Sequence, residues 1–137
     1  MIDLFNFLSG KRISILAPLF KSFNGDLKKV STDLDDLGFL KVRLNGKMMD
    51  IDKMHSIKVI PNFLYDIDVV VDRLLLDADV KTMARFIESL QAALKYGDGS
   101  NVILFLDQDT GEGFMYLLNK EAISKGLGDY KKKNELL

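Results

Sequence analysis

The most regular alternation of apolar and polar residues runs from Asp66 to Leu76 and predicts one long strand. Successive side chains of a strand point to opposite faces, so the pattern separates two sets of residues. One face carries Ile67, Val69, Val71, Arg73 and Leu75. The other face carries Asp68, Val70, Asp72 and Leu74. The first face is therefore expected to be the apolar one, and Arg73 stands out on it.

After this strand the spacing of apolar residues changes to that of an amphipathic helix, predicted over Val80–Tyr96. Asp77 or Asp79 is placed to cap its first turn, because a short carboxylate can accept from the free N–H groups there. Residues 97–99 (Gly-Asp-Gly) are expected to end the helix. The predicted apolar face consists of Val80, Met83, Ala84, Ile87, Leu90, Ala93 and Leu94.

The first third of the chain predicts the end of a helix over residues 1–8, then a strand and a second helix. The strand lies within Arg12–Phe20, and its regular part is about Ile13–Ala17 because Pro18 lacks the N–H that a neighbouring strand needs. Gly38 is placed to end the second helix in the left-handed conformation. The apolar face of that helix is Leu27, Val30, Leu34 and Leu37.

A hairpin follows this helix. Residues 39–44 alternate in polarity, Asn45-Gly46 is typical of a type I′ turn, and residues 47–51 form the return strand. Residues 52–55 then predict a turn, and residues 56–60 predict a short strand.

Beyond the long helix, strands are predicted over residues 101–107 and 114–118, joined by a turn at Asp109-Thr110-Gly111. Residues 119–137, which include Lys131–Lys133, are expected to form a mobile tail. The order of elements is strand-helix-hairpin-strand-helix-strand-strand. It predicts an α+β fold, with a mixed or antiparallel sheet and two main helices packed on it. The whole chain, residues 1–137, is predicted to be a single domain.

Composition restricts the possible functions. The 137 residues include 19 basic and 20 acidic side chains, so no global field favours nucleic acid. Cysteine is absent, which excludes disulfides and thiolate metal sites. No apolar run approaches the ~20 residues of a membrane span. The first nine residues lack the basic start of a signal peptide, so a cytoplasmic location is expected.

Few motifs of catalysis or metal binding are present. Residues 9–12 (Ser-Gly-Lys-Arg) lack the leading glycine and the hydroxyl residue of a phosphate loop. Residues 107–112 resemble the start of a calcium loop, but position twelve is Leu118, so a hairpin turn is predicted instead. His55 has no nucleophile at a suitable spacing and is predicted to be a solvated loop residue. Asp66, Asp68 and Asp72 could share a strand face, but solvated charges are the better interpretation.

Three basic residues on predicted strands remain as candidates for function. Arg73 is predicted on an apolar face, where an unpaired charge is costly. Lys41 and Arg43 share the polar face of the hairpin's first strand. Two interpretations stay open: ion pairs with the abundant aspartates, or a basic patch that binds another protein.

Four segments in this order resemble one known family: Ile15–Pro18, Leu37–Gly46, Ile67–Arg73 and Glu88–Gly99. They are similar to the UvrB-binding domain of UvrA, the damage-sensing ATPase subunit of the bacterial UvrABC excinuclease. The similarity covers roughly residues 11–107. In that family the domain is inserted after the first phosphate loop and before a cysteine cluster that binds zinc. The resemblance therefore implies that this chain is a domain excised from a longer protein.

The resemblance implies a docking function without catalysis, in which the domain recruits UvrB through a polar, charge-paired interface. The matching contact positions are Arg73 and Lys41, with Arg43 as the neighbouring basic residue. The family typically has arginine where Lys41 stands, and lysine keeps the charge but lacks the planar fork. The chain departs from the family at residues 49–65 and after Leu118. ATP, zinc and DNA would concern only the full-length protein, and neither a cofactor nor a membrane is expected for this chain.

Two other functions remain open from the sequence. One is a free-standing α+β module that binds a regulatory ligand. The other is direct contact with nucleic acid through Lys41, Arg43 and the terminal lysines, which the lack of an aromatic stacking platform disfavours.

Overall fold

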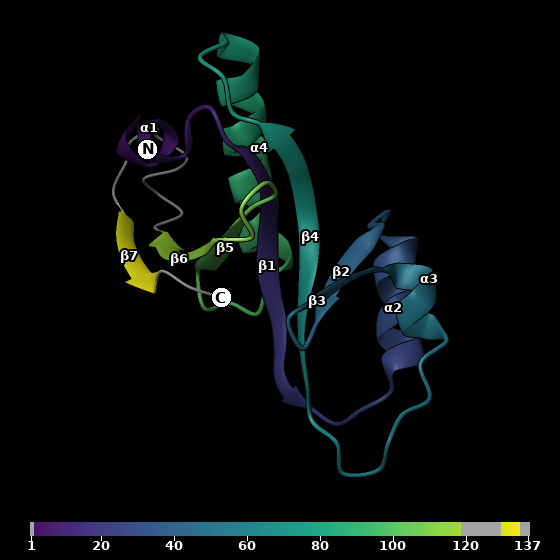
Figure 1. Ribbon diagram of the computed structural model, residues 1–137. Helices are drawn as coiled ribbons and strands as arrows, with labels where there is room; N and C mark the ends of the chain where they lie inside the picture. Colours follow the sequence, from purple (N-terminus) through teal and green to yellow (C-terminus); the bar gives the residue numbers. More distant parts are fainter. Residues whose placement is uncertain (1, 119–129, 135–137) are drawn as a thin grey trace. The chain divides into compact units, whose positions relative to one another are not determined.

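The computed structural model describes residues 2–118 and the backbone of residues 130–134 (Figure 1). The chain divides into two compact units. Unit 1 comprises residues 1–17 and 71–137, and unit 2 comprises residues 18–70. Strands β1 (Arg12–Phe23) and β4 (Tyr65–Leu75) each contribute residues to both units.

Unit 1 combines two helices with an antiparallel arrangement of strands. The helices are α1 (Ile2–Leu8) and α4 (Val80–Tyr96). The strands are hydrogen-bonded in the order β4, β1, β5 (Val102–Asp107), β6 (Gly113–Leu118) and β7 (Tyr130–Asn134). Ile13 pairs with Asp107 between β1 and β5, and Phe105 pairs with Phe114 between β5 and β6.

The core of unit 1 is built around Phe86 on α4, which is fully buried. Its ring centroid lies 5.9 Å from that of Phe5 on α1 and 6.2 Å from that of Phe105 on β5. Asp79 caps the helix, and its carboxylate accepts from the backbone N–H of Lys81 at 2.9 Å, as predicted. This helix therefore joins α1 to the sheet within the unit.

The predicted apolar face of α4 is wrong in its first turns. Val80 is 83% exposed, and Figure 1 shows the start of α4 beyond the end of β4. The buried side chains lie further along the helix: Phe86, Ser89, Leu90, Ala93 and Leu94. Leu90, Ala93 and Leu94 confirm the second half of the predicted face, whereas the buried Phe86 was not predicted because the helical spacing was counted from Val80.

Strand β1 is longer than predicted, since it continues through Pro18 to Phe23. Its pairing with β5 ends at Leu16. Pro18 follows the last of these paired residues, so its missing N–H removes no hydrogen bond between β1 and β5. At the other end of β1, Gly10 N donates to Leu76 O at 2.6 Å while Leu76 N donates to Lys11 O at 3.0 Å. Gly10 has φ +80°, and this combination is a bulge of the kind that favours glycine at its first position.

Unit 2 contains α2 (Leu27–Asp36), β2 (Lys41–Leu44), β3 (Lys47–Asp50) and α3 (Ile51–His55). Its strands are hydrogen-bonded in the order β3, β2, β4, and both pairings are antiparallel. The two helices pack on each other. Their buried apolar side chains are Leu27, Val30, Leu34, Ile51 and Met54.

The turns of unit 2 follow the predicted chemistry. Asn45 and Gly46 have φ values of +47° and +81°, which is the type I′ geometry of a two-residue hairpin. Gly38 has φ +91°, and Phe39 N donates to Leu34 O at 3.1 Å, which closes the end of α2. Leu37, predicted on the buried face of that helix, follows its last residue and is 56% exposed.

Two local predictions in unit 2 are wrong. Residues 52–55, predicted as a turn, lie in α3, whose Ile51 and Met54 are buried. Residues 56–60, predicted as a short strand, form none, although their composition is partly β-branched. Val59 and Ile60 are exposed there, so the propensity is not supported by a neighbouring strand or a core.

The α+β class and the predicted order of strands and helices are confirmed. Helix α1 lies where the end of a helix was predicted over residues 1–8. The structure adds α3 and the strand β7, whose backbone pairs with β6 where a tail was predicted. The rest of that predicted tail, residues 119–129 and 135–137, lies outside the described residues.

Candidate functional site

Strand β4 exchanges its buried side at Val70, and this changes the interpretation of Arg73. Ile67 and Val69 are buried at the start of the strand, whereas Val70 and Leu74 are buried further along. Arg73 therefore lies on the exposed face of its part of the strand. The prediction that it occupies an apolar face is wrong, and no buried charge needs to be neutralised there.

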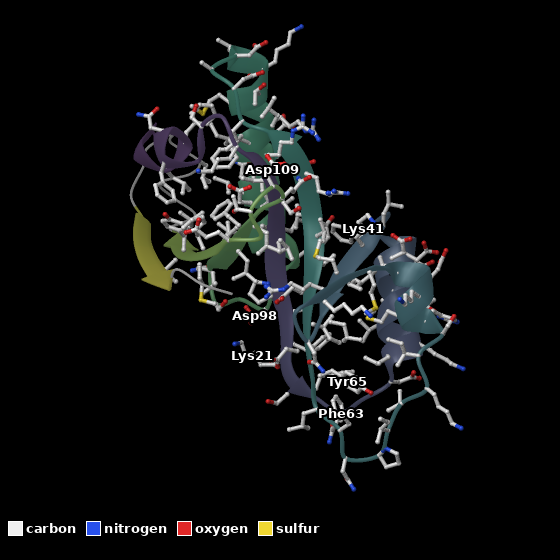
Figure 2. All side chains as sticks on the ribbon, viewed as in Figure 1. Lys21, Lys41, Phe63, Tyr65, Asp98 and Asp109 are labelled. Atoms are coloured by element: carbon white, nitrogen blue, oxygen red, sulfur yellow. The ribbon has the colours of Figure 1, made fainter. Side chains whose placement is uncertain are left out.

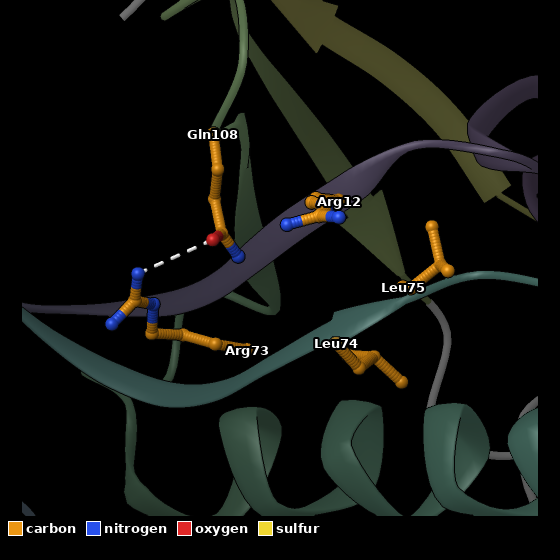
Figure 3. A pocket seen from close by; sticks show the side chains of 5 residues that line it. All are labelled: Arg12, Arg73, Leu74, Leu75 and Gln108. Atoms are coloured by element: carbon orange, nitrogen blue, oxygen red, sulfur yellow. Dashed lines mark hydrogen bonds between the residues drawn. The ribbon is translucent and has the colours of Figure 1, made fainter.

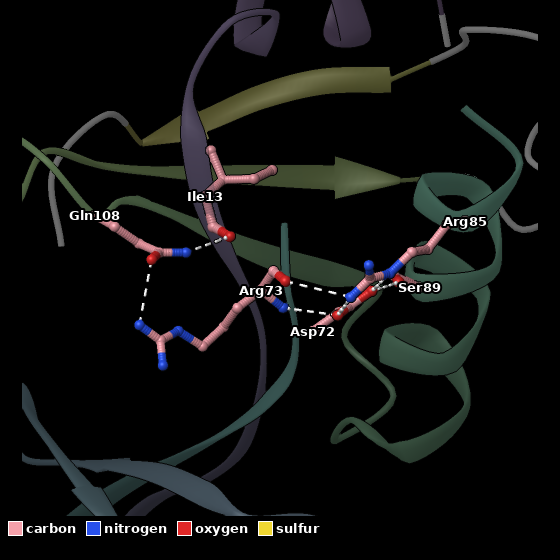
Figure 4. Close-up of polar contacts among 6 residues, drawn as sticks. All are labelled: Ile13, Asp72, Arg73, Arg85, Ser89 and Gln108. Carbon is pink, nitrogen blue, oxygen red and sulfur yellow. Dashed lines mark hydrogen bonds and ion pairs between the residues drawn. The ribbon is translucent and has the colours of Figure 1, made fainter. Parts of the chain in front are cut away.

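The residue before Arg73 fastens β4 to α4 (Figure 4). The carboxylate of Asp72 accepts from Arg85 Nη2 at 2.6 Å, from Arg85 Nε at 2.9 Å and from Ser89 Oγ at 2.7 Å. It also accepts from the backbone N–H of Arg73 at 2.8 Å. Arg85 completes the link, because its Nη2 donates to the carbonyl oxygen of Arg73 at 3.3 Å. Both peptide groups of Arg73 are therefore held.

The environment of Asp72 lowers its pKa. Burial disfavours the charged carboxylate and is the largest influence, but the hydrogen bonds from Arg85, Ser89 and the Arg73 N–H together outweigh it. The guanidinium of Arg85 correspondingly has a raised pKa through its hydrogen bond and charge interaction with Asp72. The pair is thus ionised on both sides and gives the strand end a fixed position on the helix.

The side chain of Arg73 is braced by Gln108, which follows β5 (Figures 3 and 4). Gln108 Oε1 accepts from Arg73 Nη2 at 3.2 Å, and Gln108 Nε2 donates to the carbonyl oxygen of Ile13 at 2.8 Å. Within the described part of the chain, Arg73 forms no ion pair. Its guanidinium is therefore oriented by a neutral partner and keeps its charge available.

Arg73 and Gln108 line an open pocket of about 300 Å³ together with Arg12, Leu74 and Leu75 (Figure 3). Arg12 begins β1, and its carbonyl oxygen accepts from the backbone N–H of Gln108 at 2.8 Å. Neither Arg12 nor Gln108 was predicted from the sequence to be a site residue. Arg12 begins β1 and Gln108 follows β5, and the strand order β4, β1, β5 brings both of them near Arg73 on β4.

Lys41 and Arg43 lie on β2 in unit 2, and Figure 2 labels Lys41. Lys41 Nζ is 2.7 Å from Asp50 Oδ1, with the two side chains 38% and 68% exposed. Arg43 Nη1 is 3.8 Å from Asp68 Oδ2, and both side chains are mostly covered. The ion-pair interpretation therefore holds for these two cations.

The pairing of Lys41 acts on the carboxyl group of Asp50. Its hydrogen bond, followed by its charge, lowers the pKa of Asp50. Both partners remain accessible, so water screens the pair and its strength is modest. Lys41 can be released to another acidic group at little cost, whereas Arg43 is held by its cross-strand position. Arg73 belongs to unit 1.

The other predicted sites can be placed within the described residues. No group of three or more histidine, aspartate or glutamate side chains is arranged there to hold a metal ion. Asp66 accepts from Ser22 N, Asp68 faces Arg43, and Asp72 is bound to Arg85. In the turn between β5 and β6, Asp107 Oδ1 accepts from the N–H groups of residues 109 and 110, which confirms the hairpin turn.

Of the helices in the described ranges, none combines the length and the apolar character needed to cross a membrane. The fold and the site thus define an α+β domain with an accessible, braced arginine beside an open pocket.

Comparison with known proteins identifies the family. The family model for the UvrA interaction domain matches residues 1–107. The chain belongs to this family. The matched range contains Arg12, Lys41, Arg43 and Arg73 and ends just before Gln108.

Individual relatives agree with this assignment. UvrABC system protein A of Pseudomonas putida is 34% identical over 103 residues, which is 75% of this chain and 10% of the relative. The protein of the same name from Methanothermobacter thermautotrophicus is 35% identical over 91 residues, 66% of this chain and 9% of the relative. That of Agrobacterium fabrum is 34% identical over 119 residues, 82% of this chain and 12% of the relative. The chain thus spans about a tenth of the length of these relatives.

Proposed function

We propose that this chain is the domain by which a UvrA subunit docks UvrB in nucleotide excision repair. The family assignment and the similarity to UvrABC system protein A support this role. The domain would act as an adaptor without a reaction of its own and without a bound cofactor. ATP, zinc and damaged DNA would be handled elsewhere in the longer cytoplasmic protein.

The observation that carries the proposal is the state of Arg73. An arginine at an interface contributes most when its geometry is fixed before binding and its charge has no internal partner. Arg73 meets the first condition, since Asp72 and Arg85 hold its backbone and Gln108 orients its guanidinium. It meets the second among the described residues, where it forms no ion pair. Arg73 would therefore be the main basic contact for an acidic surface of UvrB.

Lys41 and Arg43 would contribute less than Arg73. The Lys41–Asp50 pair is exposed, so a partner carboxylate can compete with Asp50 for the ammonium group. Arg43 is largely covered and lies opposite Asp68 in the strand register, which leaves it a supporting role in the sheet. The proposed order of importance is Arg73, then Lys41, then Arg43.

The test is a calorimetric titration of purified UvrB into the wild-type chain, the Arg73→Ala variant and the Lys81→Ala variant. Lys81 is an exposed cation on α4 that does not line the pocket, so its loss controls for net charge. Arg73→Ala should weaken binding about tenfold, which corresponds to about 1.4 kcal/mol. Absence of any wild-type complex at micromolar concentration, or equal affinities of the three chains, would refute the proposal.

A further inference from the structure

Two arginines of unit 1 face the same open pocket. Arg12 projects from the start of β1 and Arg73 from the end part of β4, and both line the pocket with Leu74, Leu75 and Gln108 (Figure 3). Both arginine residues are exposed. Among the residues that the structure describes, neither forms an ion pair. The described part of the chain therefore gives this pocket two positive charges and no ion-pair partner for either of them.

Gln108 connects the two arginines. Its backbone N–H donates to the carbonyl oxygen of Arg12, and its side-chain carbonyl accepts from Arg73. Its amide nitrogen is fixed on Ile13 O, so the carbonyl must point toward Arg73 (Figure 4). A guanidinium has five N–H donors and Gln108 uses one of those of Arg73, which leaves the others available.

The lining of the pocket indicates which anion it fits. Leu74 and Leu75 give it an apolar wall, and Leu75 is 49% exposed. A nucleic-acid site combines basic residues with aromatic rings on which bases stack, and none of the described residues that line this pocket is aromatic. Paired guanidinium groups beside aliphatic carbon suit a carboxylate carried on a protein side chain.

We propose that Arg12 and Arg73 form an arginine clamp that receives a glutamate or aspartate side chain of the docked partner, with Leu75 packing against the adjacent aliphatic carbon. This inference rests on the proposed docking of UvrB and assigns to Arg12 a contact role of its own. Arg73 supplies a preoriented fork, and Arg12 supplies the second charge that makes the clamp selective for a carboxylate over a neutral side chain.

The clamp makes a specific claim about side-chain shape. Arginine can bind a carboxylate with two parallel N–H groups, whereas lysine offers only a compact point charge. Arg12→Lys should therefore recover part of the affinity that Arg12→Gln loses, and Leu75→Ala should weaken binding without changing its salt dependence. A purely electrostatic contribution of Arg12 would make lysine equal to arginine.

The experiment titrates UvrB into the wild-type chain and four variants: Arg12→Gln, Arg12→Lys, Arg73→Ala and Lys81→Gln. Thermal unfolding of each chain shows whether it folds as the wild type does, which is expected because the Arg12 side chain is exposed. The inference predicts that Arg12→Gln weakens binding about tenfold, that Arg12→Lys weakens it less, and that Lys81→Gln leaves it within twofold of wild type.

Each other outcome has a definite meaning. If Arg12→Gln binds UvrB as the wild type does while Arg73→Ala binds less well, the clamp is overturned and the docking function stands. If the wild-type chain binds no UvrB, both are overturned. A parallel titration with a single-stranded oligonucleotide completes the test, because binding that is lost in Arg12→Gln would reassign the pocket to phosphate and overturn the carboxylate clamp.

Discussion

Asp72 connects the interior of unit 1 to its proposed contact residue, and replacing Asp72 by asparagine tests that connection. The carboxylate receives three side-chain hydrogen bonds from Arg85 and Ser89 and one from the backbone N–H of Arg73. Asparagine keeps the size of the side chain but has one acceptor oxygen and no charge. The variant therefore removes the ionised partner of Arg85 with little change in packing.

The expected loss of stability follows from the burial of the two partners. A hydrogen bond to a charged group contributes about 1.5–3 kcal/mol. The Asp72 side chain is 18% exposed, but the Arg85 side chain is 57% exposed, so water can replace part of the lost interaction. We expect Asp72→Asn to lower the free energy of unfolding by about 2 kcal/mol, near the lower end of that range.

Urea denaturation followed by circular dichroism measures this loss as a change in midpoint at constant slope. Asp109→Asn is the matched control, because Asp109 is exposed in the turn after β5 and its change should stay within about 0.5 kcal/mol (Figure 2). The double variant Asp72→Asn, Arg85→Gln should lose much less free energy of unfolding than the sum of the losses in the two single variants. A loss below about 0.5 kcal/mol for Asp72→Asn would refute the anchoring role.

Three further predictions follow from particular residues. The pKa of Asp72 lies below its ordinary value, so its contribution to the free energy of unfolding is complete above about pH 5 and is lost as pH falls through the lowered pKa. The free energies of unfolding of the wild type and of Asp72→Asn, measured by urea denaturation, should therefore converge in acid. Gly10→Ala should destabilise the chain by about 1–2 kcal/mol, measured by urea midpoint against Ser9→Ala, because an L-residue resists φ +80°. Phe86→Ala should cost about 3–5 kcal/mol, whereas Val80→Ala, at an exposed position, should change the melting temperature little.

Much of the fold could be predicted because its local chemistry is explicit in the sequence. The Asn45-Gly46 turn, the Gly38 helix end and the Asp79 cap each require particular residue types at particular positions, and all three occur in the structure. The errors arose where tertiary packing decides. Val80 matches the helical spacing but is 83% exposed, and Pro18 continues a strand whose ladder with β5 has already ended.

The candidate site was only partly predictable for the same reason. Arg73 was predicted as a site residue, but it was placed on the buried face of β4 because the same alternation was expected along the whole strand. In the structure the buried face changes at Val70. Lys41 and Arg43 were recognised as basic, but their partners Asp50 and Asp68 come from neighbouring strands. Arg12 is distant in sequence from Arg73 and carries no local signal.

The most direct test of the account is the affinity of UvrB for the chain with Arg73→Glu, measured beside the wild type at two salt concentrations. Charge reversal should abolish the complex at concentrations where the wild type is saturated. Binding of the wild type should also weaken as salt rises, because accessible charges are screened over about 10 Å at 0.1 M ionic strength. A wild-type affinity that Arg73→Glu leaves unchanged would contradict the central claim that this braced arginine carries the docking.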